Sequence, residues 1–277
     1  MTILLTLVSL LAVELQAPAP APVGEPILPA MLRTATVGAG TSQGSSADTL
    51  RIEVGSDAVD GRVFPPHRAR NTVYIGDSTE PAVSWTNELT VGDSAGRQVM
   101  RWVTRGGPAG DGEGTEWELR QTYDARTLAP LAWERTAGNG AFVRLRMDGT
   151  RVHGVRRAPG ASAHDTIDVT LDRLGFIASA SDLVPMAVGL RAGVVIIAPV
   201  WAPGMAAAEE RVFTVLGEQA VTVEDAEVVA WKVEERVLSS GDLVANWYLT
   251  EASPYMVYAE VMQADGLVRR ITGVALD

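Results

Sequence analysis

Serines in nucleophile-like motifs lie in contexts that do not suit catalysis. Residues 40–44, GTSQG, match the G-x-S-x-G pattern of a nucleophile elbow, but they lie in a stretch of small polar residues. An elbow needs a buried strand before the serine and a helix after it. Asp77-Ser78 and Asp93-Ser94 each follow a glycine, which is typical of turns in which Asp and Ser bond their own backbone. We therefore interpret all three motifs as loop or turn sequence.

Histidine and cysteine, the usual transition-metal ligands, form no metal-binding pattern. The histidines are His67, His153 and His164, which are far apart and have no second histidine or carboxylate at a ligand spacing. Cysteine is absent, which excludes disulfides, thiolate catalysis and Cys-ligated zinc or iron–sulfur sites. We expect no metal and no cofactor.

Paired carboxylates could support glycoside hydrolysis, which needs two such groups about 5–9 Å apart in a cleft. The glutamates that invite this interpretation are Glu116, Glu118, Glu134, Glu234 and Glu235. All five fall on expected polar strand faces or at strand ends, where a solvated side chain is the default. We therefore expect no catalytic residues and a protein that is not an enzyme.

Charge narrows the range of partners. The net charge is −11 and the pI about 4.8, so the surface repels phosphate backbones and we expect no nucleic-acid partner. One segment, RVHGVRR, nevertheless places His153 among Arg151, Arg156 and Arg157. This composition is typical of an exposed strand whose charges discourage edge pairing. An anion-binding patch is the alternative interpretation.

Tryptophan is the remaining anomaly, with seven in the chain, six of them in expected strands. They are bulky core residues in the simplest interpretation. The functional alternative is an aromatic-lined concavity, because curved sheets and barrels hold ligands in such places. The candidate lining residues are Trp117, Trp133, Trp231, Trp247, Met256 and Tyr258.

The N-terminal segment has features of an export signal. Residues 3–13, ILLTLVSLLAV, form an apolar run that is too short to span a bilayer but has the length of a signal-peptide core. We predict a signal peptide over residues 1–17, with an uncleaved anchor as the alternative, although no Lys or Arg precedes the run. Residues 18–48 are rich in Pro, Ala, Gly and Ser and predict an extended tether. We therefore expect a periplasmic or secreted protein of a bacterial envelope.

Residues 49–277 predict one antiparallel β domain. Apolar and polar residues alternate in TEWELRQTY, AFVRLRM and TIDVTL, as in half-buried strands. Turn signals separate such runs, and Asp148-Gly149 is the strongest hairpin signal. We count about twelve strands at the spacing of a β meander, sandwich or barrel. Helical signal is confined to residues 181–190, where Ser181 could cap the helix and Pro185 falls in its first turn.

Two segments repeat one device, an aromatic strand end, a short polar turn and a proline before the return strand. They are TYDARTLAPLAWER (122–135) and WYLTEASPYMVYAE (247–260). Proline at the first position of a strand removes no ladder hydrogen bond. We therefore interpret both segments as hairpins of one meander. In the second, Met256 and Tyr258 add an apolar second face, which predicts a strand covered on both sides.

The second half of the chain resembles a family of exported bacterial proteins grouped as a domain of unknown function. The resemblance rests on the Val-x-Gly-x-x-x-Val pattern at 215–221, the Ala-Trp-Lys-Val strand at 230–233 and the Trp-Tyr strand end at 247–248. The turn at 224–228 and the turn at 251–253 depart from the family pattern. The repeated hairpin is more distantly similar to the half-barrels of LolA/LolB-type lipoprotein carriers, which implies acyl-chain binding on a concave face. No functional residue carries over from either family.

These observations predict a mostly β fold, a curved antiparallel sheet or half-barrel with one short helix. The function we expect is that of a non-catalytic envelope protein which binds an apolar or lipid-like ligand in an aromatic-lined concavity. The alternative is a structural or interaction module that joins an envelope protein partner and has no small-molecule ligand. The sequence does not fix the oligomeric state.

Overall fold

The computed structural model describes residues 48–109, 114–263 and 265–276. In these ranges it has sixteen strands. The strands are β1 (Thr49–Arg51), β2 (His67–Ile75), β3 (Val83–Ser94), β4 (Arg97–Pro108), β5 (Trp117–Asp124), β6 (Pro130–Ala137), β7 (Phe142–Asp148), β8 (Arg151–Arg157), β9 (Asp165–Thr170), β10 (Phe176–Ile177), β11 (Val195–Trp201), β12 (Glu209–Val223), β13 (Ala226–Val237), β14 (Leu243–Leu249), β15 (Met256–Met262) and β16 (Val268–Leu276). The helical elements are the 3-10 turns η2 (Gly61–Val63) and η3 (Ala178–Ala180) and the helix α2 (Leu183–Val188).

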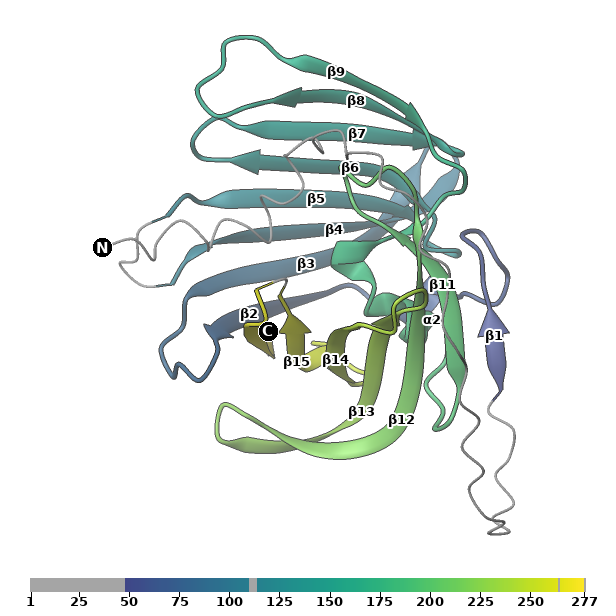
Figure 1. Cartoon of the computed structure of the whole chain (residues 1–277), viewed down its shortest axis with the longest axis vertical. Helices are drawn as coiled ribbons and strands as arrows, with labels where there is room; N and C mark the ends of the chain where they lie inside the picture. The colour runs from purple at the N-terminus through teal and green to yellow at the C-terminus, as the bar shows by residue number, and fades with distance from the viewer. Residues whose placement is uncertain (1–47, 110–113, 264, 277) are drawn as a thin grey trace, which may run out of the picture.

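All sixteen strands belong to one curved sheet (Figure 1). Strands β2 to β9 follow one another as antiparallel neighbours, and so do β11 to β16. The pairing of β16 with β2 joins the two runs, so the second half of the chain precedes the first half in the sheet. The path does not close, since it ends at β9 on one side and at β1 on the other, and only β1 and β10 pair in parallel, both with β11.

The predicted fold class, a mostly antiparallel curved sheet with one short helix, is confirmed. The alternation is clearest in β5, where Leu119, Gln121 and Tyr123 are buried and Arg120 is exposed. The strands are more numerous than expected. The Asp148-Gly149 hairpin is present, with Asp148 paired to Arg151 across a two-residue turn.

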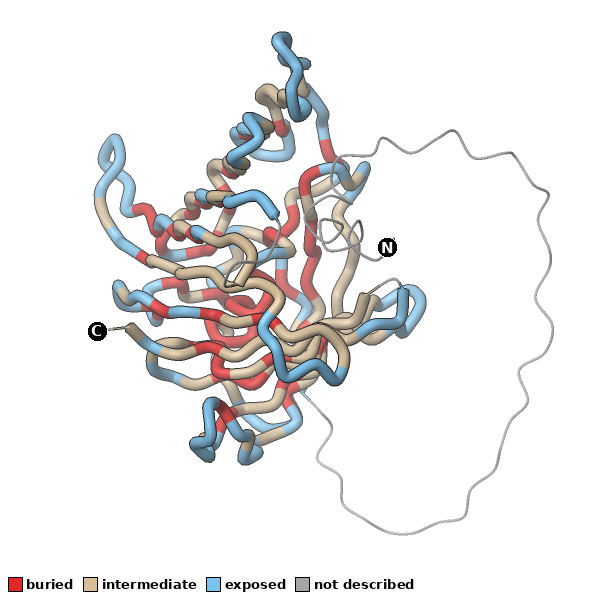
Figure 2. The backbone as a smooth tube through the Cα atoms, turned by 90° about the vertical axis from the view of Figure 1, so that its left-hand side faces the viewer, coloured by how far each residue is buried: buried red, intermediate tan, exposed pale blue. Residues whose placement is uncertain are grey.

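The concave side of the sheet is filled by η3 and α2 (Figure 1), which lie against strands from both halves of the chain. We call the resulting apolar cluster the main core. Figure 2 shows that buried residues lie mainly in the middle of the strands and exposed residues mainly at the hairpin ends. Its fully buried members include Leu183 of α2, Met100 of β4 and Phe213 of β12. Ser181 does not cap α2; the N-cap is Asp182, without a side-chain cap bond.

The long β12–β13 hairpin folds back over the opposite face of the sheet. A bulge at Leu216 shifts the register between β12 and β13, and the next residue, Gly217, has φ of 117°, which favours glycine. Beyond this bend the hairpin covers a second apolar cluster, which we call the hairpin cluster. Its buried residues are Val223, Ala230, Tyr248 and Val257. At the hairpin tip, Glu224 Oε1 lies 3.0 Å from Nη2 of Arg70 on β2.

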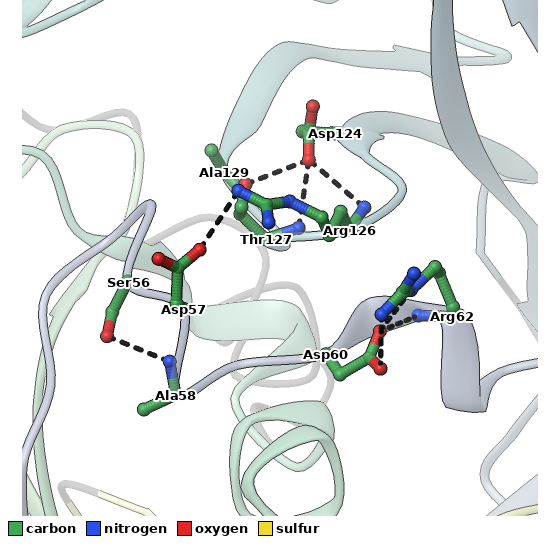
Figure 3. A network of polar contacts seen from close by, with 9 residues as sticks. All are labelled: Ser56, Asp57, Ala58, Asp60, Arg62, Asp124, Arg126, Thr127 and Ala129. Atoms are coloured by element: carbon green, nitrogen blue, oxygen red, sulfur yellow. Dashed lines mark hydrogen bonds and ion pairs between the residues drawn. The ribbon is translucent and has the colours of Figure 1, made fainter.

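The two proline hairpins are present as β5–β6 and β14–β15. The β5–β6 turn contributes Ala125 and Leu128 to the main core. In this turn Asp124 Oδ1 accepts hydrogen bonds from the backbone N–H and the hydroxyl of Thr127 (Figure 3). Figure 3 also shows Arg126 of this turn in an ion pair with Asp57, in the segment leading to η2. The backbone N–H of Gly61 donates to the carbonyl of Arg126, which ties η2 to the turn.

Several predictions concern residues that the structure does not describe. The signal peptide (1–17), nearly all of the tether (18–48) and the GTSQG motif lie outside the described ranges. Among the described residues no helix is both long and apolar enough to cross a membrane.

Candidate functional site

A cleft of about 850 Å³ lies at the end of the sheet where β3 and β5 begin and β4 and β6 end. These strands are antiparallel neighbours, so these four strand ends lie side by side. Trp117 is paired with Gly106 on one side and with Ala137 on the other. Most of its lining therefore comes from four consecutive strands. Arg70 is added from β2, and Gly114, Glu116 and Gly138 are added from the segments beside β5 and β6.

Two tryptophans form the apolar wall of this cleft. The rings of Trp85 and Trp117 are 6.4 Å apart between centroids and tilted by 51°. Gly106 lies between them, and a Cβ there would be 2.6 Å from Cζ2 of Trp117 and 2.7 Å from Cβ of Trp85. The missing side chain thus lets the indoles approach. Both tryptophans are only half-buried, which leaves aromatic surface facing the cleft.

Ion pairs border the cleft on the other face of the sheet, because Arg105 and Glu118 alternate with Gly106 and Trp117 along β4 and β5. Arg105 Nε lies 2.6 Å from Oε2 of Glu118, and Arg120 Nε lies 2.5 Å from its Oε1. Burial acts to raise the pKa of Glu118, but the hydrogen bonds from Arg120 and Arg105 outweigh it and lower that pKa below the usual value. Glu118 is therefore a fixed carboxylate, suited to orient its arginine neighbours and unsuited to donate a proton.

The structure distributes the six predicted lining residues over several places. Trp117 lines the Trp85–Trp117 cleft and also packs against the main core. Trp133 is 3% exposed and belongs to the main core, which also includes Met256 and has Trp231 and Trp247 packed against it. Tyr258 packs on the hairpin cluster, with its ring 5.3 Å from that of Tyr248.

A β-bulge explains why Met256 and Tyr258 lie on opposite faces of β15. Tyr248 pairs with Tyr258, and Leu249 pairs with Met256, so Val257 is an extra residue on β15. The extra residue turns Met256 toward the main core and leaves Val257 and Tyr258 on the hairpin cluster. The strand is covered on both sides, but Met256 and Tyr258 do not share a face as the sequence alone implied.

A buried acidic pair lies where the segment before α2 meets the sheet. Glu235 of β13 is 1% exposed and accepts hydrogen bonds from the hydroxyl of Ser181 at 3.0 Å and from Nε1 of Trp247 at 2.9 Å. Its other oxygen lies 3.3 Å from Nη1 of Arg211. Burial raises the pKa of Glu235, against the opposing effects of Arg211, Trp247 and Ser181. Burial and the nearby charge of Glu235 raise the pKa of Asp182 to about 7.

The expectation that all five glutamates are solvated is wrong for Glu235. Glu234 and Glu235 are consecutive in a strand, so one of them must face inward. Glu234 takes the outward position and pairs with Arg236 at 2.6 Å. The consecutive pair was the signal available in the sequence, although it does not say what would neutralise the inner carboxyl.

The histidines stay apart in the structure. His67 packs edge-on against Tyr255 at 4.6 Å between centroids, and burial lowers its pKa. His153 lies on β8, opposite Arg146 of β7. Among residues 48–109, 114–263 and 265–276, no cluster of three His, Asp or Glu side chains could hold a metal ion.

Comparison with known proteins gives one structural likeness. The chain is similar to the crystal structure of a β-barrel-like protein of the domain of unknown function DUF1849 from Brucella abortus, at 11% sequence identity and a TM-score of 0.47. The match covers 77% of this chain and 96% of that chain. No protein-family profile matches the chain, and no curated protein matches it. The likeness assigns this chain no activity, and the resemblance to LolA/LolB-type carriers stays a prediction.

Proposed function

We propose that this chain is a non-catalytic binding protein of the bacterial envelope that holds the apolar part of a lipid-like ligand in the Trp85–Trp117 cleft. The observation that carries the proposal is the half-buried tryptophan pair over Gly106. Indoles held in this way offer apolar surface to a ligand with little loss of their own freedom. The volume of about 850 Å³ lies within the range of roughly 300–1,000 Å³ for small-molecule sites.

The indoles and not the charged groups define the ligand that this cleft suits. Arg70 and Arg105 border the cleft from the other face of the sheet, because they alternate along their strands with the residues that carry or face the indoles. Each of these arginines already forms an ion pair, Arg70 with Glu224 and Arg105 with Glu118. The aromatic surface therefore favours the apolar chain of a ligand.

A binding role fits the cleft better than catalysis. Its border carboxylate Glu118 is held between two arginines, and its pKa is lowered, so this group has no proton to give near neutral pH. The buried acids Asp182 and Glu235, whose pKa values are raised, do not line the cleft.

Export is part of the proposal and rests on the sequence. The apolar run at residues 3–13 and the small residues after it support a processed envelope protein. N-terminal sequencing of the protein recovered from a bacterial periplasmic fraction tests this point. We expect a mature chain that begins near Pro18, and an intact Met1 in the cytosolic fraction would contradict it.

Binding is tested with the full chain and a fluorescent acyl probe, dansylaminoundecanoic acid. Replacing both Trp85 and Trp117 by Ala should weaken probe binding by about tenfold or more, since each lost aromatic contact is worth at least about 1 kcal/mol. Trp231→Ala is the matched control, because it removes an indole that packs on the main core outside the cleft. Equal affinity of wild type and double variant, or no binding by wild type, would overturn the proposal.

A structural or interaction module remains the second candidate function, favoured by the free edge of β9. This strand ends the sheet and pairs only with β8 among the described strands, so the N–H and C=O groups on its other side can accept a partner strand. Pull-down from envelope extracts, with Val169→Pro on β9 as the test variant, would detect such a partner. Loss of a stable partner in the variant would support this role.

A further inference from the structure

A second groove, of about 700 Å³, crosses the face of β3–β8 that points away from the main core. One line of cross-strand neighbours runs through it, because Arg101 is paired with Thr122, Thr122 with Ala132, Ala132 with Arg146, and Arg146 with His153. All five residues line the groove. The groove therefore has a floor fixed by sheet register and not by loops.

The floor is low in its middle and raised at its sides. Thr122 and Ala132 have short side chains, whereas Arg101 and Arg146 have long ones on the flanking strands. Arg101 and Arg146 are three strands apart, which is about 14 Å at roughly 4.8 Å per strand. Two cations thus flank a shallow channel whose centre leaves room for a ligand.

The other charges along the groove are already neutralised. Arg97 Nε lies 2.6 Å from Oδ2 of Asp124, and Arg144 Nε lies 2.6 Å from Oε1 of Glu134. Asp168, which faces His153 from β9, is held by Arg151 at 2.7 Å. These pairs contribute little net charge to the groove.

Arg101 and Arg146 differ from these neighbours. Both are exposed, and within the described ranges neither forms an ion pair. Nη1 of Arg101 lies close to Gly92, 3.3 Å from where a Cβ would stand, so its guanidinium is next to backbone and not to a carboxylate. Although the chain has 34 acidic residues against 23 basic ones, none of the described carboxylates is paired with these two cations.

We propose that this groove binds an elongated ligand with two anionic groups, phosphates or carboxylates, one at Arg101 and one at Arg146. Guanidinium groups bind such groups through paired, charge-assisted hydrogen bonds, and in the described part of the chain these two have no carboxylate partner that a ligand would have to displace. The acidic surface elsewhere disfavours anions, so binding should be confined to the groove. The proposal is independent of the Trp85–Trp117 cleft, which is lined by a different set of residues.

The first experiment measures binding of two probes to the full chain by titration calorimetry at low salt. Inorganic phosphate has one anionic group, and hexane-1,6-diol bisphosphate has two at a separation that approaches the spacing of the arginines. We expect the bisphosphate to bind at least about tenfold more tightly than phosphate, and its binding to weaken as salt rises. Equal weak binding of both probes would overturn the two-group proposal.

The second experiment removes the two cations. Arg101→Gln with Arg146→Gln should reduce bisphosphate affinity by about tenfold or more, and each single substitution should lose part of that. The matched control is Arg68→Gln with Arg191→Gln, which removes the same charge from two exposed arginines outside the groove. If the control pair loses as much affinity as the groove pair, the effect is one of net charge and the proposal fails.

A third measurement distinguishes the two sources of the anionic groups, lipid headgroups and a soluble ligand. Sedimentation with phosphatidylglycerol vesicles, compared with phosphatidylcholine vesicles, reports binding to lipid headgroups. Vesicle binding that the bisphosphate displaces assigns the groove to headgroups, and bisphosphate binding without vesicle binding assigns it to a soluble ligand. Vesicle binding that survives in the Arg101→Gln, Arg146→Gln variant would contradict the assignment to this groove.

Discussion

The main core and the hairpin cluster show two ways in which one sheet buries apolar surface. The main core is closed from within, because η3 and α2 fill the concave side against strands from both halves of the chain. The hairpin cluster is closed by the sheet itself, because β12 and β13 bend back across the opposite face. Two buried carboxyl groups, Asp182 and Glu235, lie beside the main core. The charged neighbours of the hairpin cluster, Lys232 over the Tyr248 ring and Glu260 at the Tyr258 hydroxyl, are only partly buried.

The difference implies different mechanical roles. The main core connects segments that are far apart in the sequence, so it cannot open without separating both halves of the chain. The hairpin cluster has four buried residues and is covered by one hairpin, so it can open while the rest stays folded. We therefore expect global stability to depend on the main core and local opening to depend on the hairpin.

The largest expected effect comes from truncating a buried side chain of α2, which fills the concave side of the sheet. Leu183 of α2 is 1% exposed, and Leu183→Ala should lower the free energy of unfolding by about 2–5 kcal/mol through lost burial and the cavity that remains. Urea denaturation of the full chain measures this change.

The matched variant in the other cluster is Val257→Ala, which removes two buried carbons and should cost about 1–2 kcal/mol. The comparison is informative because the two losses should also differ in kind. Leu183→Ala should lower the midpoint of a single cooperative transition, whereas Val257→Ala should mainly increase amide exchange in the hairpin. An equal loss of global stability in both variants would break the distinction between the clusters.

The second prediction concerns the acids beside the main core. With its pKa raised to about 7 from a value near 3.8, the folded Asp182 carboxyl keeps its proton where the unfolded one loses it. Its contribution to stability is therefore complete below about pH 4 and is lost as the pH rises through 7. Asp182→Asn should abolish this loss, since the amide does not ionise. At about 1.4 kcal/mol per pKa unit, the effect on the free energy of unfolding is at most of the order of 4 kcal/mol.

The measured quantity is the difference in unfolding free energy between wild type and Asp182→Asn across pH 4 to 8. Other groups with shifted pKa values, such as His67 and Glu118, titrate in both proteins and cancel in that difference. Glu235 is the exception, because removing the nearby charge of Asp182 also eases its ionisation. A difference that stays constant with pH would show that Asp182 is not the titrating group.

The β architecture follows from local pattern, and that part could be predicted. Alternation in β5 and the Asp148-Gly149 turn depend on residues close in sequence, and each gave the right element. The two proline hairpins could be predicted for the same reason. The short helix near residue 183 could also be predicted, because its sequence lacks the alternation of the strands around it.

What could not be predicted depends on single extra residues and on distant partners. The bulge at Leu216 bends the hairpin, and the bulge at Val257 separates Met256 from Tyr258, yet neither residue has a sequence signal of its own. The burial of Glu235 depends on Ser181, which is 54 residues away along the chain. Likewise Trp85 was not expected in the cleft, because its approach to Trp117 depends on Gly106 of the strand between them.

The smallest expected effect is at the tip of the hairpin. Glu224 and Arg70 form an ion pair whose side chains are 44% and 48% exposed, and such pairs contribute about 0–1 kcal/mol. Glu224→Gln should therefore leave the urea midpoint nearly unchanged and increase amide exchange only at the end of β12 and the start of β13. Glu227→Gln, which removes the same charge from an exposed position after the tip, is the control. Because Arg70 also borders the Trp85–Trp117 cleft, a change in acyl-probe affinity in Glu224→Gln alone would mean that the hairpin and the cleft are coupled through this one guanidinium group.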